Sequence, residues 1–285
     1  ASWWDYGYWI TTLSDRTTII DNATLIDWQI KKMAYSLIST PENSWHILNS
    51  DHSVDVSKYI GDENIQLWGG TPNVEFQNDY TTKKFFKDET LEYNKLSQDE
   101  KNLVDNYISQ NGHIDCEQVF KKESKQLGIR EQSCNPVTKG MDADYVLIYI
   151  ASERIAAQGS TDMFFYTLDG GADESKKAWF MKISNHNLYD FVENDNMTHT
   201  QNFEENSTLG KLIPFSIWKY VHPETDIIYD EYTNGLIPIY IKNIKYVDPD
   251  RDPFYLVYAS PSFYNNIPGA MTSVLIYKIN PDYQF

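Results

Sequence analysis

The chain has little positive charge and no long hydrophobic run. Its 24 Lys and Arg face 41 Asp and Glu, which gives a net charge of −17 at pH 7. Because a nucleic-acid surface must neutralise phosphates and no basic cluster is present, nucleic acid is not expected as a partner. No stretch of the 285 residues approaches about eighteen apolar residues, and no basic segment followed by an apolar one opens the chain. Neither a membrane span nor a signal peptide is therefore expected in it.

Cysteine and metal-binding patterns are also scarce. The 2 cysteines, Cys116 and Cys134, are too few for a disulfide framework, and whether they form one bridge is left open. The 6 histidines do not show the spacing of metal ligands. Residues 248–252 (DPDRD) begin like a calcium loop, but Pro253 stands where such a loop needs a glycine, so a solvated turn is expected. No metal ligand is predicted in this chain.

The secondary-structure signals follow the order helix, insertion, strand, helix and then strands. Apolar residues at helical spacing predict a helix over 24–39 that ends before Pro41. A continuous apolar run predicts a buried strand over 143–151, and Asp173 is expected to cap the start of a helix. A broken helix is predicted over 208–221, and the remaining tail alternates apolar and polar residues as strands do.

These signals predict a mixed α+β fold. A helical central core with a small sheet is expected to form from both ends of the chain, residues 1–46 and 142–285. Residues 47–141 are polar and rich in turn-forming residues, and they carry both cysteines. They are predicted to form an inserted subdomain.

The chain opens with ASWWDYGYWI, an aromatic cluster around one carboxylate. Trp3, Trp4 and Asp5 could form a small hydroxyl-binding site, because a carboxylate accepts a hydrogen bond from a hydroxyl while an indole N–H donates to the same oxygen. Gly7 allows the backbone to turn tightly there. The alternative is structural: the aromatic side chains anchor the segment under the core and Asp5 caps a turn. The residues by themselves leave both interpretations open.

The same segment resembles a family signature. SWWDYGYWIT followed by DRTTIIDNAT is similar to the start of the lumenal or extracellular C-terminal domain of the catalytic subunit of asparagine-linked oligosaccharyltransferases, which opens with Trp-Trp-Asp-Tyr-Gly. An Asp-Tyr-Val-Leu strand at 144–147 and a closing Ile-Tyr-Lys strand near 276–278 keep the family's order. The resemblance covers the two segments assigned to the core and leaves the insertion unmatched.

The resemblance implies a binding site for an acceptor polypeptide. These enzymes transfer an oligosaccharide from a lipid carrier to the Asn amide of an Asn-x-Ser/Thr sequon, and Trp3, Trp4 and Asp5 match the residues that bind the sequon's hydroxyl. A hydrogen bond to a charged group contributes about 1.5–3 kcal/mol, whereas the methyl group that distinguishes Thr from Ser contributes about 1 kcal/mol or less. We therefore expect firm rejection of Ala at the third sequon position and a mild preference for Thr over Ser.

A second family motif, Asp-x-x-Lys-x-x-x-Met/Ile, lies on a kinked helix beside the first. Asp173 and Lys176 match its first half, but Phe180 stands where Met or Ile is expected, and Met181 comes one residue late. Either Asp173, Lys176 and Phe180 are the working set, or a locally shifted helix presents Lys177 and Met181, which lie four apart. The first register is favoured because the neighbouring residues also match the family.

The resemblance also implies which parts of the enzyme lie elsewhere. In the family, carboxylates of a membrane-embedded portion hold a divalent cation, Mn²⁺ or Mg²⁺, that activates the acceptor amide, and the same portion takes the lipid-linked oligosaccharide. The chain is therefore expected to be the extracellular domain of a multi-pass membrane enzyme, selecting the acceptor without catalysing transfer. No catalytic residue and no cofactor is assigned to it. The long insertion and acidic composition suggest an archaeal enzyme.

Two other classes of protein remain open from the sequence. An extracellular carbohydrate-binding or surface-layer module would stack Trp3, Trp4 and some of the 21 tyrosines on sugar rings. A secreted glycoside hydrolase would need two opposed carboxylates, which an acidic chain could supply. Only the acceptor-recognition hypothesis requires the Trp-Trp-Asp motif to lie beside the helix of Asp173 and Lys176.

Overall fold

The computed structural model describes residues 1–3, 6–14, 16–20, 27–49, 97–99, 102, 141–156, 163–167, 172–184, 186–193, 198–265 and 267–284. The chain divides into two compact units. One contains Ala1–Leu25, Met33–Asn49 and Asp142–Phe285, and the other contains Ile26–Lys32 and Ser50–Met141. Cys116 and Cys134 lie outside the described residues. Within the described ranges, no helix combines the length and the apolar character needed to cross a membrane.

The described residues form both helices and strands, interspersed along the chain. The helices are α1 (Gly7–Ser14), α2 (Asp27–Ile38), α3 (Pro41–Asn49), α11 (Lys177–Ile183), the 3₁₀ helix η5 (Leu188–Asp190), α12 (Gln201–Asn206), α13 (Thr208–Leu212) and α14 (Pro261–Tyr264). The strands are β1 (Tyr145–Ala156), β2 (Met163–Thr167), β3 (Phe215–Val221), β4 (Ile228–Tyr229), β5 (Ile237–Lys242), β6 (Phe254–Ala259) and β7 (Gly269–Ile279). The predicted mixed α+β class is confirmed.

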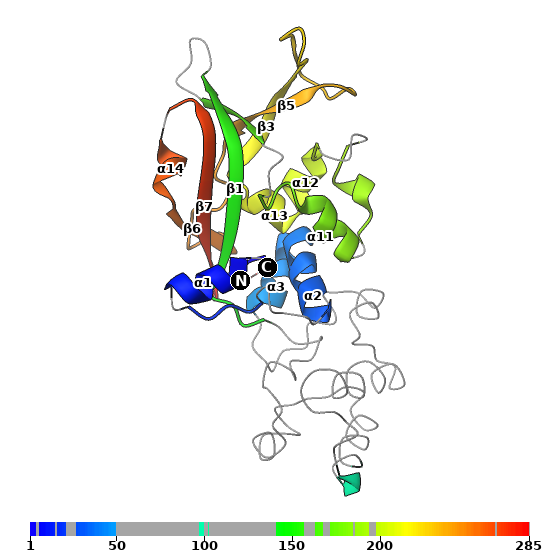
Figure 1. Ribbon diagram of the computed structural model, residues 1–285, viewed down its shortest axis with the longest axis vertical. Coiled ribbons are helices and arrows are strands. Elements are labelled where there is room, and N and C mark those ends of the chain that lie inside the picture. The colour runs from blue at the N-terminus through cyan, green and yellow to red at the C-terminus, as the bar shows by residue number, and fades with distance from the viewer. Residues whose placement is uncertain are drawn as a thin grey trace. The chain divides into compact units, whose positions relative to one another are not determined.

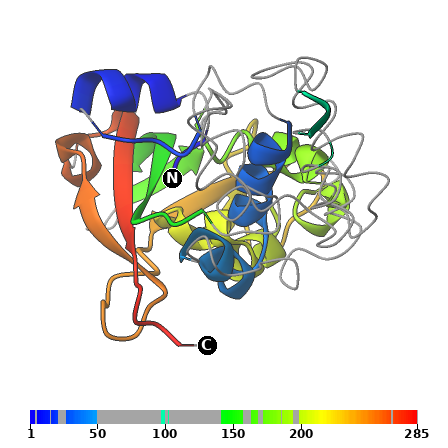
Figure 2. The ribbon, with the colours of Figure 1, turned by 90° about the horizontal axis from the view of Figure 1, so that it is seen from below.

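The strands form one seven-stranded sheet in the order β4-β3-β5-β2-β1-β7-β6, with every neighbouring pair antiparallel. The long pairing of β1 with β7 runs from Tyr145 opposite Lys278 to Arg154 opposite Gly269. Helices α3, α11, α12 and α13 lie on the same side of the β1–β7 pair in two perpendicular views (Figures 1 and 2). The helical part of the core therefore lies against one face of the sheet.

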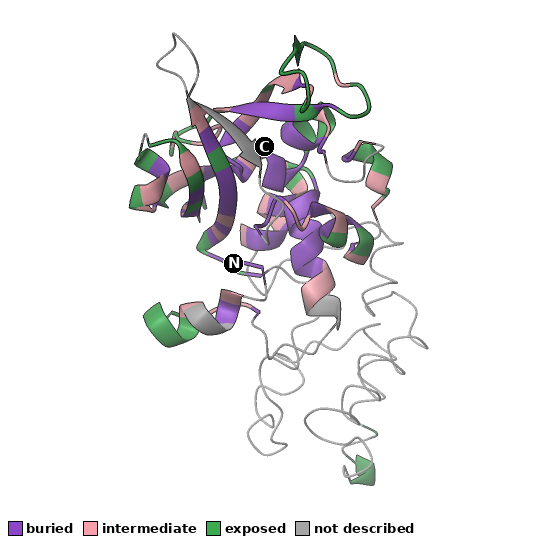
Figure 3. Cartoon of the chain, turned by 45° about the horizontal axis from the view of Figure 1, so that its top comes forward, coloured by how far each residue is buried: buried purple, intermediate pink, exposed green. Residues whose placement is uncertain are grey.

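The core follows the two-residue period of β1 and β7. Val146 and Ile148 on β1 are buried, as are their partners Tyr277 and Leu275 on β7, while the intervening residues are more exposed. Figure 3 shows this buried band along the strands and on the facing helices. The Tyr277 hydroxyl donates to the Leu212 carbonyl at 2.7 Å, so the buried tyrosine gains a hydrogen-bond partner at the end of α13.

Within the described residues, the predicted helix over 24–39 is confirmed as α2, which ends before Pro41 as expected. Pro41 is itself the first residue of α3, where its fixed φ and missing N–H are tolerated. The predicted helix over 208–221 is wrong in its second half. It ends at Leu212, and Phe215–Val221 forms β3, because these residues pair with β5 across the sheet.

Gly210 allows α12 and α13 to approach closely. A Cβ atom at this position would lie 2.0 Å from the Phe203 carbonyl oxygen. Alanine normally stabilises a helix relative to glycine by about 1 kcal/mol, but this clash has no flexible side chain to relieve it. Gly210→Ala is therefore expected to destabilise the protein by about 1–3 kcal/mol in urea unfolding. Lys211→Ala, on the same helix, is the control, and equal stability of the two variants would contradict the close packing.

The two ends of the predicted insertion meet in the first unit. The Ala143 amide donates to the Leu48 carbonyl at 2.7 Å, which joins the end of α3 to the start of β1. An insertion between adjacent ends disturbs the surrounding core little. Almost all of residues 50–141 lie outside the described part of the chain, so the inserted subdomain stays a prediction.

Candidate functional site

The N-terminal segment is held on an unpaired edge of β1. Strand β2 pairs only with the second half of β1, from Ser152 to Ala156. Beside the first half, the Leu147 amide donates to the Ala1 carbonyl at 2.8 Å, and the Ala1 nitrogen donates to the Tyr145 carbonyl. The segment that carries the aromatic motif therefore takes the place of a neighbouring strand, and it lies beside the start of β1 in both ribbon views (Figures 1 and 2).

Asp173 binds the next position on the same edge. Its amide donates to the Tyr149 carbonyl at 2.9 Å, and the Tyr149 amide donates to Asp173 Oδ2 at 2.8 Å. Both backbone groups of Tyr149 are thus satisfied by one residue. The N-terminal segment and the turn that leads into α11 are consequently anchored two residues apart on one strand.

Tyr6 connects the two segments through side chains. Its hydroxyl donates to Asp173 Oδ1 at 3.2 Å and accepts a hydrogen bond from Lys176 Nζ at 2.8 Å. The same Nζ atom lies 4.5 Å from the centre of the Tyr6 ring, and the Tyr149 ring meets Tyr6 edge to face at 6.0 Å. An acid, a base and a hydroxyl are therefore fixed in one hydrogen-bonded group beside the opening motif.

Trp3 makes the second contact between the motif and α11. Its indole packs on Phe180 with 4.5 Å between ring centres, and the two side chains are 5% and 0% exposed. Buried aromatic pairs of this kind contribute beyond their buried area. Phe180 therefore packs against Trp3 inside the protein and does not line an open surface.

The residues next to Asp173 and Lys176 point into the protein. Lys177 Nζ donates to Glu174 Oε1 at 2.6 Å, and His199 bridges that same oxygen and Glu204 Oε1, at 3.0 Å to each. All four side chains are buried. Burial alone would raise the pKa of Glu174, but the Lys177 charge and the His199 hydrogen bond outweigh it and bring the pKa to about 2.

The structure brings together four of the seven residues that the sequence singled out: Trp3, Asp173, Lys176 and Phe180. Trp4 and Asp5 lie outside the described residues, although their neighbours Trp3 and Tyr6 both contact the α11 region. Met181 is fully buried.

The predicted capping role of Asp173 is wrong. The N-cap position of α11 is Lys176, which makes no side-chain cap, and the Asp173 carboxylate binds Tyr6 and Tyr149 instead. Sequence reasoning missed both tyrosines as site residues. Tyr6 lies inside the opening motif and could have been considered. Tyr149 is one of several residues in the apolar run over 143–151, and nothing in the neighbouring sequence indicates that it belongs to a site.

Comparison with known proteins finds similarity over a limited part of the chain. No family model matches. The chain is 44% identical over 55 residues to "Dolichyl-diphosphooligosaccharide--protein glycosyltransferase subunit STT3" of Saccharomyces cerevisiae, covering 19% of this chain. It is 42% identical over 70 residues to subunit STT3A of Oryza sativa and 39% identical over 70 residues to subunit stt3 of Schizosaccharomyces pombe, covering 25% of this chain in each case. Part of the chain is related to STT3 subunits. The matches span 8% of the length of these relatives.

The burial of the candidate side chains bears on the two alternative functions. A sugar-stacking module would need Trp3 at the surface, but this indole is buried against Phe180. A glycoside hydrolase would need opposed carboxylates facing a cleft, whereas Glu174 and Glu204 are buried with His199 between them. Neither alternative gains support from these described residues.

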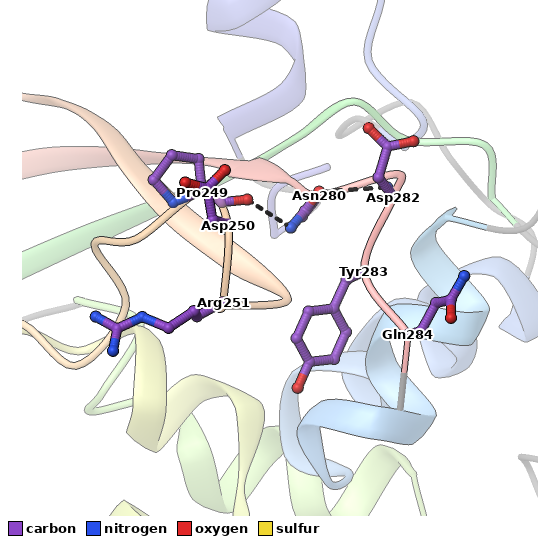
Figure 4. Close-up of a pocket in the computed structure, with 7 residues that line it drawn as sticks. All are labelled: Pro249, Asp250, Arg251, Asn280, Asp282, Tyr283 and Gln284. Carbon is purple, nitrogen blue, oxygen red and sulfur yellow. Dashed lines mark hydrogen bonds between the residues drawn. The ribbon is translucent and has the colours of Figure 1, made fainter.

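A separate pocket of about 380 Å³ lies near the C-terminus (Figure 4). It is lined by Pro249, Asp250, Arg251, Asn280, Asp282, Tyr283 and Gln284, and none of the candidate-site residues described above is among them. The side-chain amide of Asn280 donates to the carbonyls of Pro249 and Asp252, so it holds the turn together. Asp252 Oδ2 accepts from the amides of Val247 and Asp248, which fits the predicted solvated turn better than a calcium loop.

Within the described ranges, no three His, Cys, Asp or Glu side chains are arranged to hold a metal ion. The buried His199 is instead used by two carboxylates. These described residues therefore do not fit a resident cation, and no catalytic step is assigned to one.

Proposed function

We propose that this chain recognises the acceptor sequon, Asn-x-Ser/Thr, for an STT3-like oligosaccharyltransferase in protein N-glycosylation. One observation carries the proposal: Trp3 and Tyr6 of the opening motif contact Phe180, Asp173 and Lys176 of the second motif. Acceptor recognition requires the two motifs to lie close together. Neither a carbohydrate-binding module nor a hydrolase requires this proximity. The partial similarity to STT3 subunits supports the same class.

The proposed roles divide between binding and support. Trp4 and Asp5 bind the Ser/Thr hydroxyl of the acceptor, with Asp5 as the hydrogen-bond acceptor. Lys176, the cation of the second motif, hydrogen-bonds to the neighbouring Tyr6. Trp3 and Tyr6 hold the segment in place, because Trp3 is buried and Tyr6 bonds to both Asp173 and Lys176.

The contacts favour the register with Asp173, Lys176 and Phe180. Lys176 and Phe180 reach the opening motif, whereas Lys177 is paired with Glu174 on the buried side and Met181 is fully enclosed. Because Phe180 is also enclosed, its contact with a threonine methyl group would need movement of Trp3. Selection of Thr over Ser through Phe180 therefore stays a prediction.

In the full-length enzyme, we assign transfer to a membrane-embedded portion of the protein. That portion would hold the lipid-linked oligosaccharide and the Mn²⁺ or Mg²⁺ ion, while this domain faces the extracellular side, as in an archaeal enzyme. The chain alone is then expected to bind acceptor peptides without transferring sugar. Glycosyl transfer by the chain alone would contradict this division.

Three peptides test acceptor recognition. Peptides that differ only in Thr, Ser or Ala at the third sequon position would be titrated into the chain and followed by NMR, and would be compared as acceptors of the full-length enzyme. We expect Ala to bind about 10- to 100-fold more weakly than Thr, because a missing hydroxyl leaves Asp5 without its partner.

The matched variant is Asp5→Asn, which keeps the shape of the side chain but removes its charge. This variant should bind the Thr and Ser peptides more weakly than the unmodified chain does, and its affinity for the Ala peptide should be unchanged. Equal binding of the Thr and Ala peptides by the unmodified chain would disprove the proposed hydroxyl recognition.

A further inference from the structure

The turn before α11 carries two pairs of charged side chains, and each pair contacts a different part of the protein. Asp173 and Lys176 meet the opening motif, whereas Glu174 and Lys177 enter the buried group with His199 and Glu204. The turn is closed by hydrogen bonds from the Lys176 amide to the Asp173 carbonyl and from the Lys177 amide to the Glu174 carbonyl, each 3.2 Å. Because the two pairs interleave within five residues, a shift of the buried pair must displace the motif pair.

The hydrogen bonds of His199 favour a doubly protonated ring. An ionised carboxylate can only accept, and the two ring nitrogens of His199 each lie 3.0 Å from a different carboxylate. With both carboxylates ionised, each nitrogen donates, which makes the ring an imidazolium. Two negative groups, Glu174 and Glu204, then balance two positive groups, Lys177 and His199.

The buried group connects the turn to three further elements. Glu204 belongs to α12, and its Oε1 also accepts a hydrogen bond from the Ile217 amide of β3 at 2.8 Å. The Phe203 and Tyr240 rings lie 5.0 and 5.2 Å from the His199 ring and exclude water from it. The ionisable groups that act on His199 are thus Glu174 and Glu204, while Lys177 pairs with Glu174 and the Tyr240 phenol on β5 packs against the ring.

We propose that His199 and Glu204 are positioning residues, which hold Asp173 and Lys176 in place for acceptor binding as long as His199 is doubly protonated. The inference rests on the proposed function for its consequence in binding, but the coupling itself concerns this chain alone. Loss of the His199 proton leaves two buried carboxylates with one cation, so the turn that carries Asp173 must rearrange or take in water.

The direction of the pH effect follows from the shifted groups. Burial alone would lower the pKa of His199, but the hydrogen bonds to Glu174 and Glu204 outweigh it, and the pKa is raised. A raised histidine pKa contributes stability that is present below about pH 6.5 and is lost as pH rises through the folded-state value. On the acid side, the stability that the ionised Glu174 contributes is present above its ordinary pKa of 4.5 and is lost as the pH falls toward its folded-state pKa of about 2.

NMR titration of the chain without peptide tests the coupling. The reporters are the His199 ring carbons and the Tyr149 amide, which donates to Asp173 Oδ2. We expect both signals to move with one pH midpoint, and Glu204→Gln to lower that midpoint by about one pH unit, because the amide can still accept a hydrogen bond but carries no charge. The neighbouring exposed residue supplies the control, Glu205→Gln, which should leave the midpoint unchanged.

Peptide titration then tests the consequence. Affinity for a Thr peptide should fall about tenfold as pH rises through the same midpoint. His199→Gln should bind weakly at every pH, whereas His222→Gln, a change at a more exposed histidine, should behave like the unmodified chain. Thermal unfolding of each variant shows that it is folded at the measuring temperature.

The two proposals fail separately. If the Tyr149 amide signal does not move as His199 titrates, the positioning role is overturned, whether or not peptide binding depends on pH. A Tyr149 amide that follows His199 in a chain that binds no peptide would support the coupling and overturn acceptor recognition.

Discussion

Replacing Lys177 with Met is expected to lower the free energy of unfolding by about 3–5 kcal/mol. The Lys177 side chain is 4% exposed, and its Nζ donates to Glu174 Oε1 at 2.6 Å. Methionine keeps most of the apolar stem, so the loss is chiefly of charge. Glu174 and Glu204 would then compete for His199, two buried carboxylates against one imidazolium. Urea unfolding at pH 6, below the raised pKa of His199, measures the loss.

The adjacent residue provides the control. Lys176→Met removes a cation from the same turn, but this side chain is only partly buried and bonds to Tyr6. Its expected stability loss is below about 1 kcal/mol, while affinity for a Thr peptide should fall about tenfold. The opposite pattern, a stable Lys177→Met chain that no longer binds peptide, would favour the register with Lys177 and Met181.

These two lysines show how far the sequence could predict the site. The spacing of Asp173 and Lys176, together with the opening motif, was enough to propose that the two segments meet. The sequence favoured Lys176 only through the resemblance of its neighbours to the family, because Lys176 and Lys177 both lie one helical turn from an apolar residue. The structural contacts that distinguish the two lysines come from partners distant in the chain, Tyr6 for Lys176 and Glu174 with His199 for Lys177.

The fold shows the same limit at two elements. α2 and β1 have strong local patterns, and both were predicted, although β1 continues to Ala156, five residues beyond the predicted end at 151. Residues 215–221 have no pattern that separates a strand from a continued helix, and they become β3 by pairing with β5.

The half of β1 that β2 leaves uncovered, on which the candidate site is built, depends on where β2 starts and ends. A β2 strand that extended along β1 as far as Tyr149 would cover the edge that binds Ala1 and Asp173. Sequence patterns specify which residues favour a strand, but not how far β2 extends along β1.

Phe180→Ala is expected to cost about 3–5 kcal/mol of stability and to weaken peptide binding as well. Phe180 is fully buried and its ring packs on Trp3 at 4.5 Å, so truncation leaves a cavity directly under the opening motif. Urea unfolding measures the first effect. The Trp3 indole N–H signal and a Thr-peptide titration, both at a temperature where the variant is folded, measure the second.

Two controls separate packing from recognition in this prediction. Phe254→Ala removes an equally buried ring on β6, so it should cost similar stability but leave peptide affinity unchanged. Phe180→Met fills most of the space with the residue type that the family motif carries, and should cost less than about 1.5 kcal/mol. If Phe180→Ala bound peptide as tightly as Phe254→Ala, Trp3 would not need its support to form the acceptor site. The contact between the two motifs would then serve stability alone, because recognition would not depend on how firmly Trp3 is held.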